Sequence, residues 1–159
     1  PGPPAAEAPP PHPAQPGPAP DVAAAARRWL GVRWQHQGRD RAGVDCAGLA
    51  IAVAQEVRGS TFDVTGYARL ASDETMLALC DQLLVRRPGP QHAQVGDVLV
   101  MRFDSQRHMA ICAPYVWGGL SIVHAHAPSR RVVEHRLDAA WLARTIAAYG
   151  WPSSFGGAV

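Results

Sequence analysis

The chain has 159 residues, a formal net charge of +2 and 47% hydrophobic residues, which is enough for one ordinary domain with a core. Its fifteen basic residues are all arginine and are scattered along the chain, so the composition argues against a nucleic-acid-binding protein. No run approaches the roughly 18 apolar residues of a membrane span, so insertion into a membrane is not expected.

The first twenty residues, PGPPAAEAPPPHPAQPGPAP, hold ten of the fifteen prolines and no large apolar side chain. Such a segment cannot bury enough surface to fold, so residues 1–20 are predicted to be a disordered, proline-rich leader. The leader also lacks the apolar stretch of a signal peptide. Residues 21–152 are predicted to form the domain, and residues 153–159 a flexible tail.

Helices are predicted in the first half of the domain. Asp21 is placed to cap a helix that ends at Gly31, and the polar stretch 32–45 is predicted to be a loop. The apolar run over residues 46–57, CAGLAIAVAQEV, then predicts a buried core helix. Gly59 is the residue expected to end it.

The second half changes from a helical period to short β-branched runs. Ser72 is placed to cap an amphipathic helix over residues 73–87, and Asp138 opens a last helix over 139–149 that ends at Gly150. Between these helices, four antiparallel strands are predicted at 96–103, 107–113, 120–127 and 130–137. Helices followed by strands predict an α+β domain, with N-terminal helices on one face of an antiparallel sheet of about four to six strands and a C-terminal helix.

Three cysteines occur, Cys46, Cys80 and Cys112, with no CxxC spacing. A disulfide framework or a thiolate zinc site is therefore not expected. Cys46 differs from the other two because it opens the predicted core helix, where unpaired N–H groups and the helix dipole favour a thiolate. Taken alone, its position is more typical of a small buried side chain, because free cysteines are commonly buried.

A cysteine nucleophile needs a base, and the base needs a group that orients it. His108 and His124 lie in consecutive predicted strands, and neighbouring antiparallel strands can place their imidazoles side by side. The chain contains no asparagine, so a papain-type asparagine cannot be the orienting group and a second histidine is the natural candidate. His126 shares a strand face with His124, which leaves two choices for that role.

The pattern His124-Ala125-His126 also occurs in metal sites, because residues two apart on a strand face the same way. A third ligand at a recognisable spacing is missing, and His135 is the one loose candidate. No metal and no cofactor is therefore expected.

In their order along the chain, these motifs resemble the NlpC family of papain-like bacterial cell-wall cysteine peptidases, and especially its phage-tail and gene-transfer-agent branch. The resemblance is carried by ARRWLGVRWQHQG, VDCAGLA, VGDVLVMRF, RHMAIC and IVHAHA. The closing segment VVEHRLDAAWLARTIAAYGWP is similar to the tail branch. The match covers residues 21–152.

The resemblance implies a papain-like domain in which Cys46 is the nucleophile, His108 the base and His124 the group that orients His108. It prefers His124 to His126 because the family carries a His-Ala pair at this point of the strand.

Three further residues acquire roles only through the resemblance. Asp45 would hold the helix start or contact a substrate amine. Trp34 takes the place of an aromatic residue, usually tyrosine, that lines the oxyanion region. Ala47 stands where many members have serine, so substrate recognition is expected to differ there.

The activity implied is hydrolysis of peptidoglycan stem peptides, typically at the bond from γ-D-glutamate to diaminopimelate, without a cofactor. The branch implies a virus-like tail that opens the cell wall in the bacterial periplasm, in contact with peptidoglycan and other tail-tip proteins. Two alternatives stay open. One is a non-catalytic wall-binding or tail-tip module, degenerate at Trp34 and Ala47, and the other is an amidase or acyltransferase on the same fold.

Overall fold

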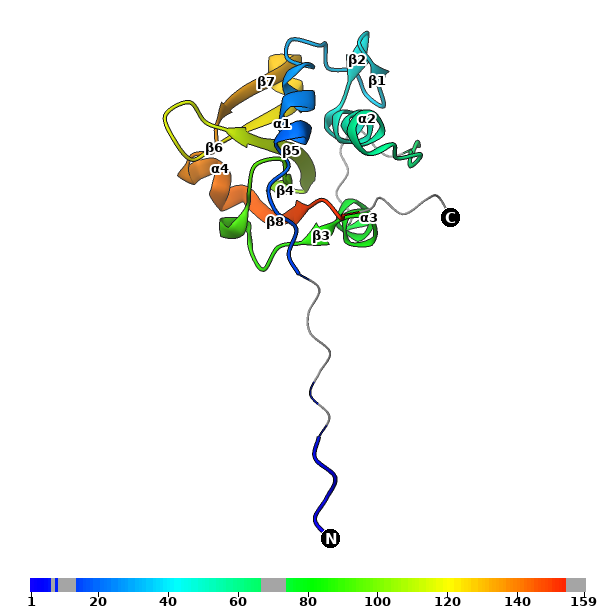
Figure 1. Ribbon diagram of the computed structural model, residues 1–159. Helices are drawn as coiled ribbons and strands as arrows, with labels where there is room; N and C mark the ends of the chain where they lie inside the picture. The colour runs from blue at the N-terminus through cyan, green and yellow to red at the C-terminus, as the bar shows by residue number, and fades with distance from the viewer. Residues whose placement is uncertain (7, 9–13, 67–73, 154–159) are drawn as a thin grey trace.

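The computed structural model describes residues 1–6, 8, 14–66 and 74–153 (Figure 1). The helices are α1 (Pro20–Arg27), α2 (Cys46–Arg58), α3 (Thr75–Leu83) and α4 (Ala139–Arg144). The strands are β1 (Arg39–Asp40), β2 (Gly43–Val44), β3 (Val85–Arg86), β4 (Val98–Phe103), β5 (Gln106–Pro114), β6 (Leu120–His126), β7 (Arg131–Arg136) and β8 (Thr145–Gly150). Short 3₁₀ turns occur at Pro90–His92 and Ala127–Ser129.

Six antiparallel strands form the main sheet in the order β3-β8-β4-β5-β6-β7, and β1 and β2 form a separate hairpin. All four strands predicted from the sequence lie in this sheet, as β4 to β7. The predicted α+β class, with helices packed on an antiparallel sheet, is therefore confirmed. Within the described part of the chain, no helix is long and apolar enough to cross a membrane.

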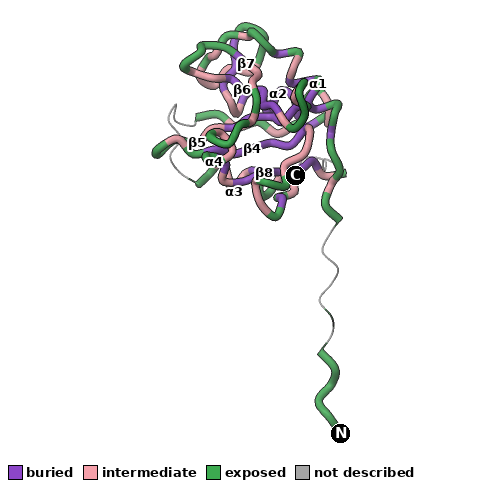
Figure 2. Tube along the Cα trace, turned by 90° about the vertical axis from the view of Figure 1, so that its left-hand side faces the viewer, coloured by how far each residue is buried: buried purple, intermediate pink, exposed green. Residues whose placement is uncertain are grey.

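The main sheet is buried on both faces, because alternate residues of each central strand belong to two different apolar clusters. On β4, Val98 and Val100 face α1 and α2, whereas Leu99 and Met101 belong to the cluster that includes Trp141 of α4. The N-terminal helices thus share one face, as predicted, and the C-terminal helix lies on the other. The central elements accordingly appear buried in Figure 2.

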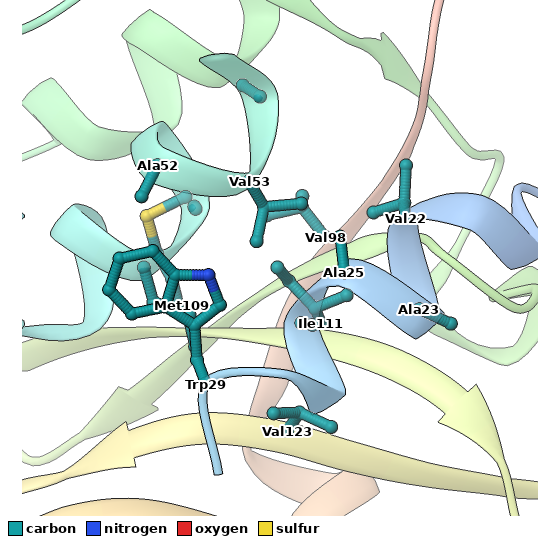
Figure 3. Close-up of a cluster of buried hydrophobic side chains, with 14 of the residues drawn as sticks. Val22, Ala23, Ala25, Trp29, Ala52, Val53, Val98, Met109, Ile111 and Val123 are labelled. Atoms are coloured by element: carbon teal, nitrogen blue, oxygen red, sulfur yellow. The ribbon is translucent and has the colours of Figure 1, made fainter. Parts of the chain in front are cut away.

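Helix α2 is the core helix that the apolar run predicted. Its Leu49 and Val53 are 1% and 0% exposed, and burial of side chains of this size stabilises a fold by about 1.5–3 kcal/mol each. Figure 3 shows Val53 packed with residues of α1 and of the sheet. The helix ends as predicted at Gly59, whose φ of 63° is the left-handed conformation that glycine adopts without steric cost.

The start of α1 differs from the prediction. Ala19, not Asp21, occupies the N-cap position, and no side chain caps the helix. The reason is Pro20, whose fixed φ suits the first helical position. Asp21 lies inside the first turn and pairs instead with Arg58 of α2, at 2.5 Å.

The prediction of one continuous helix over residues 139–149 is wrong for its second half. Asp138 does cap α4, accepting from the Trp141 N–H, but the helix ends at Arg144. Residues Thr145–Gly150 form β8, a central strand between β3 and β4. Pairing on both sides and nearly complete burial override the helical preference of the two alanines in this segment.

Two other predicted boundaries shift. The helix predicted over 73–87 is α3, which spans Thr75–Leu83, and Val85–Arg86 pairs with β8 as an edge strand. Ser72, the predicted cap, lies outside the described residues. The stretch predicted as a loop, 32–45, contains the β1–β2 hairpin.

The last residues of the predicted leader contact the domain. Ala19 is 6% exposed and donates its N–H to the Val95 carbonyl at 2.8 Å. The Pro16 carbonyl accepts a hydrogen bond from Arg87 at 2.5 Å. Residues 1–6 extend away from the domain and are exposed (Figure 2).

Candidate active site

Asp45 builds the start of helix α2, directly before Cys46. Its Oδ1 accepts the Gly48 N–H at 2.7 Å, and its Oδ2 accepts the Gln37 N–H at 2.7 Å. The carboxylate is buried and also lies 3.6 Å from the Arg39 guanidinium. Because both oxygens already bind groups of the protein, the geometry favours the helix-start role of Asp45 over contact with a substrate amine.

Gly48 lets the loop before α2 lie directly on the first turn of the helix. A Cβ atom at this position would lie 2.1 Å from the Gly38 carbonyl oxygen and 2.8 Å from the Arg39 Nη1. The space over Gly48 is therefore filled by the Gly38 carbonyl and by the side chains of Arg39 and Asp45. Its lack of a side chain serves packing rather than the approach of a substrate.

Gly48→Ala is expected to destabilise the domain by about 1–3 kcal/mol, because the added methyl group must displace backbone that is already packed. The free energy of unfolding in urea measures the loss. Gly59→Ala is the matched control on the same helix: its Cβ would meet nothing within 4 Å, so only the left-handed φ opposes it, at about 1 kcal/mol. A Gly48→Ala protein as stable as wild type would contradict the close packing.

The Cys46 thiol is half-buried at the first residue of α2 and packs against the core between the helices and the sheet. Burial raises the pKa of the thiol to about 11, and a backbone hydrogen bond from Met109 acts in the opposite direction. The net direction is opposite to that expected from a helix N-terminus alone. The bond to Met109 places the sulfur beside β5 at the residue that follows His108.

His108, His124 and His135 form a chain of hydrogen-bonded imidazoles across three neighbouring strands. His108 Nε2 lies 2.6 Å from His124 Nδ1, and His124 Nε2 lies 2.8 Å from His135 Nε2. His135 Nδ1 lies 3.0 Å from the Arg136 carbonyl oxygen. Sequence reasoning considered His135 only as a loose metal ligand, because its place beside His124 depends on the register of β6 and β7.

The two candidates for the orienting group have different partners. His124 is fully buried and bonds His108, whereas His126 Nδ1 lies 2.7 Å from the Ser129 hydroxyl. Among the described residues, His124 and not His126 is therefore the histidine hydrogen-bonded to His108. That His124 orients a catalytic His108 stays a prediction of the family resemblance.

Trp141 of α4 packs over the imidazoles. Its ring centroid lies 5.2 Å from that of His124 and 4.7 Å from that of His135. Burial lowers the pKa of His124 to about 2, and it lowers the pKa of His108 to about 3. Both rings are accordingly neutral at physiological pH, and a neutral imidazole is the form that can accept a proton.

Trp141→Ala is expected to raise the pKa of His124 toward its ordinary value near 6.5, because water would reach a ring that burial now keeps neutral. A titration of the histidine ring signals by NMR measures the change. Leu142→Ala is the matched control, since it truncates the neighbouring residue of the same helix. If both variants left the titration of His124 unchanged, Trp141 would not be the residue that shields the His124 ring from water.

His108 Nε2 is engaged by His124, so Nδ1 is the ring nitrogen that could act on Cys46, the predicted nucleophile. Within the described residues, no hydrogen bond joins Cys46 Sγ to His108, and the sulfur instead meets the backbone of the next residue, Met109. Strand β5 pairs with β6 from Ile111 to Pro114. His108 thus lies beyond the end of that ladder, where β5 passes the start of α2.

The remaining predicted residues lie around the thiol. Trp34 and Ala47 are half-buried and pack against the same cluster as Cys46. The backbone of Trp34 pairs with Val44, two residues before Cys46, and its N–H donates to the Arg130 carbonyl at 2.9 Å. Among the described residues, no group of three or more His, Cys, Asp and Glu side chains has an arrangement that could hold a metal ion.

Solved structures share this architecture. The NlpC/p60 domain of the peptidoglycan hydrolase SagA matches with a TM-score of 0.60 and 23% identity, over 82% of this chain and 96% of that one. The chain has the fold of an NlpC/p60 domain. The sequence itself matched no family model and no curated protein.

Two further NlpC/p60 structures contain the same fold within longer chains. An NlpC/p60 family protein from Bacillus cereus ATCC 10987 matches with a TM-score of 0.60 and 21% identity, over 86% of this chain and 41% of that one. A protein similar to an NLP/P60 family lipoprotein, from Staphylococcus aureus subsp. aureus Mu50, matches with a TM-score of 0.53 and 19% identity, over 80% and 39%. The chain thus spans about two-fifths of these two proteins.

Proposed function

We propose that this protein is a cysteine peptidase that hydrolyses the stem peptides of peptidoglycan. The observation that carries the proposal is the placement of Cys46 at the start of α2, beside β5, whose His108 is hydrogen-bonded to His124 of the neighbouring strand β6. A neighbour of the same fold is a peptidoglycan hydrolase, which supports the choice of substrate class.

The reaction would proceed by acyl transfer through a thioester. His108 Nδ1 takes the thiol proton as the Cys46 sulfur attacks the peptide carbonyl, and the electron pair of that carbonyl moves to its oxygen. N–H groups at the start of α2, including that of Cys46, would hold the resulting oxyanion. The intermediate then collapses, the C–N bond breaks, and His108 returns the proton to the leaving amine.

Water completes the cycle. His108, neutral again, removes a proton from a water molecule that attacks the thioester carbonyl, and the C–S bond then breaks. The acyl group leaves as a carboxylic acid and the proton returns to the sulfur. Because the thiol and His108 are both neutral at rest, the thiolate would form only as attack begins.

We further propose that the bond cleaved is the one from γ-D-glutamate to diaminopimelate, and that the protein acts in a phage or gene-transfer-agent tail. The closing segment 132–152 and the order of motifs support this branch by resemblance. Peptidoglycan and other tail-tip proteins would then be its partners. Mass spectrometry of purified tail particles, with the chain present or absent, tests the location independently of activity.

Digestion of purified peptidoglycan, followed by mass spectrometry of the soluble fragments, tests the activity. The expected product carries a new amine terminus on diaminopimelate, and boiled protein is the blank. Release of intact stem peptides would identify an amidase instead. If the protein sedimented with the peptidoglycan but released no fragment from it, it would be a binding module, and the peptidase proposal would be contradicted.

A further inference from the structure

The chain of imidazoles ends on a group that can only accept a hydrogen bond. His135 Nδ1 lies 3.0 Å from the Arg136 carbonyl oxygen, so this nitrogen must carry the proton and donate it. In neutral His135, Nε2 is then an acceptor. The carbonyl at the edge strand β7 thus determines which nitrogen of His135 is protonated.

The same reasoning passes along the chain one ring at a time. His124 Nε2, at 2.8 Å from the acceptor on His135, must donate, so His124 Nδ1 is the acceptor of that ring. His108 Nε2, at 2.6 Å from His124 Nδ1, must donate in turn. His108 Nδ1 is left with a lone pair, which is the form that a base for Cys46 requires.

We propose that His135 is a positioning residue that holds His108 in its Nε2–H tautomer, acting through His124. The proposal rests on the proposed function, because the tautomer matters only if His108 is the base. Among the described residues, the contacts of His135 run to His124, the Arg136 carbonyl and Trp141, and none runs to Cys46. It determines the direction of the two hydrogen bonds that connect β7 to β5.

The packing around His135 holds its ring in the orientation that this role needs. On the sheet, His135 pairs with Ile122, and His124 lies two residues along β6 from Ile122, paired with Val133. Both histidines therefore point to the same face. The ring centroids of His124 and His135 are 4.9 Å apart, and Trp141 lies 4.7 Å from His135 on the outer side. The ring is thereby confined between His124 and α4.

Two-bond ¹⁵N–¹H NMR correlations of the histidine rings, recorded near pH 8 where an ordinary imidazole is neutral, test the proposal without substrate. Wild type is expected to show His108 in the Nε2–H form alone. His135→Leu removes the acceptor, so His108 should become a mixture of tautomers. His135→Gln keeps an oxygen that can accept from His124 and should restore the wild-type pattern.

His126→Leu is the matched control, because His126 lies on the same sheet face but bonds Ser129. In this variant, the NMR pattern of His108 should be the same as in wild type. An Nδ1–H signal for His108 in the wild-type protein would overturn the proposal, and this result needs no variant to fold. A His135→Leu protein that kept the pure Nε2–H form would overturn it as well.

The rate at which iodoacetamide alkylates Cys46 gives a functional readout that is also independent of peptidoglycan. His135→Leu is expected to lower this rate by roughly fivefold to tenfold, the effect of one lost hydrogen bond, and His135→Gln to recover most of it. A loss of rate in His135→Leu without a change of tautomer would show a merely structural role. If wild type shows the predicted tautomer but cleaves no peptidoglycan, the proposed function fails while the positioning role stands.

Discussion

Cys46→Ala is expected to abolish the release of fragments from peptidoglycan, with a loss on the order of 10³-fold or more, because no other group can form the thioester. Helix α2 places this thiol beside β5, where it meets the backbone of Met109, the residue that follows His108. Cys46→Ser keeps the volume and a polar atom at the helix start but supplies a far weaker nucleophile, so it should be nearly as inactive. Fragment yield per unit time, measured by mass spectrometry, gives both losses.

Cys80→Ala serves as the control for this experiment. Cys80 is a buried thiol on α3, and its removal should lower the free energy of unfolding while activity changes by no more than a few-fold. A Cys46→Ala protein that still released diaminopimelate-terminated fragments at the wild-type rate would show that the nucleophile lies elsewhere.

His124→Ala is expected to lower activity by about 10²-fold or more, whereas His126→Ala should lower it by less than about threefold. His124 bonds His108 directly and is fully buried, while His126 bonds Ser129. Removing the orienting partner lets the base rotate and take either tautomer, which costs much of the benefit of general-base catalysis. Rates of fragment release from the two variants provide the comparison.

His124→Ala also leaves a cavity in the cluster under α4, so a second variant is needed to separate a loss of stability from a loss of catalysis. His124→Gln keeps a polar side chain that can accept from His108 and should be more active than His124→Ala at similar stability. A larger loss in His126→Ala than in His124→Ala would refute the assignment of the orienting residue.

Much of the framework followed from local patterns. The run from Cys46 to Val57 predicted α2 because its apolar residues are continuous and Gly59 supplies a left-handed end. The strands β4 to β7 were recognisable because they are short runs containing β-branched residues and bounded by turn residues. Both signals arise within about ten residues of chain, so no knowledge of the tertiary structure was needed.

The segment Thr145–Gly150 shows where local patterns fail. Ala147 and Ala148 continue the helical composition of α4, yet the segment is a central strand and both alanines are nearly fully buried. The free energy that decides this comes from pairing with β3 and β4 and from burial on two faces. Those partners are distant in the sequence, and β3 is only two residues long, so no pattern within the segment could indicate them.

In the candidate site, too, some features follow from the sequence and others from the tertiary structure alone. By itself, the sequence placed Cys46 at a helix start and two histidines, His108 and His124, on consecutive strands, because apolar runs and turn residues are local signals. Only the tertiary structure decided that His124 rather than His126 bonds His108, and that His135 continues the chain. Hydrogen bonds between rings depend on strand register and on atomic distances of a few ångströms, which only the packing of the sheet under α4 determines.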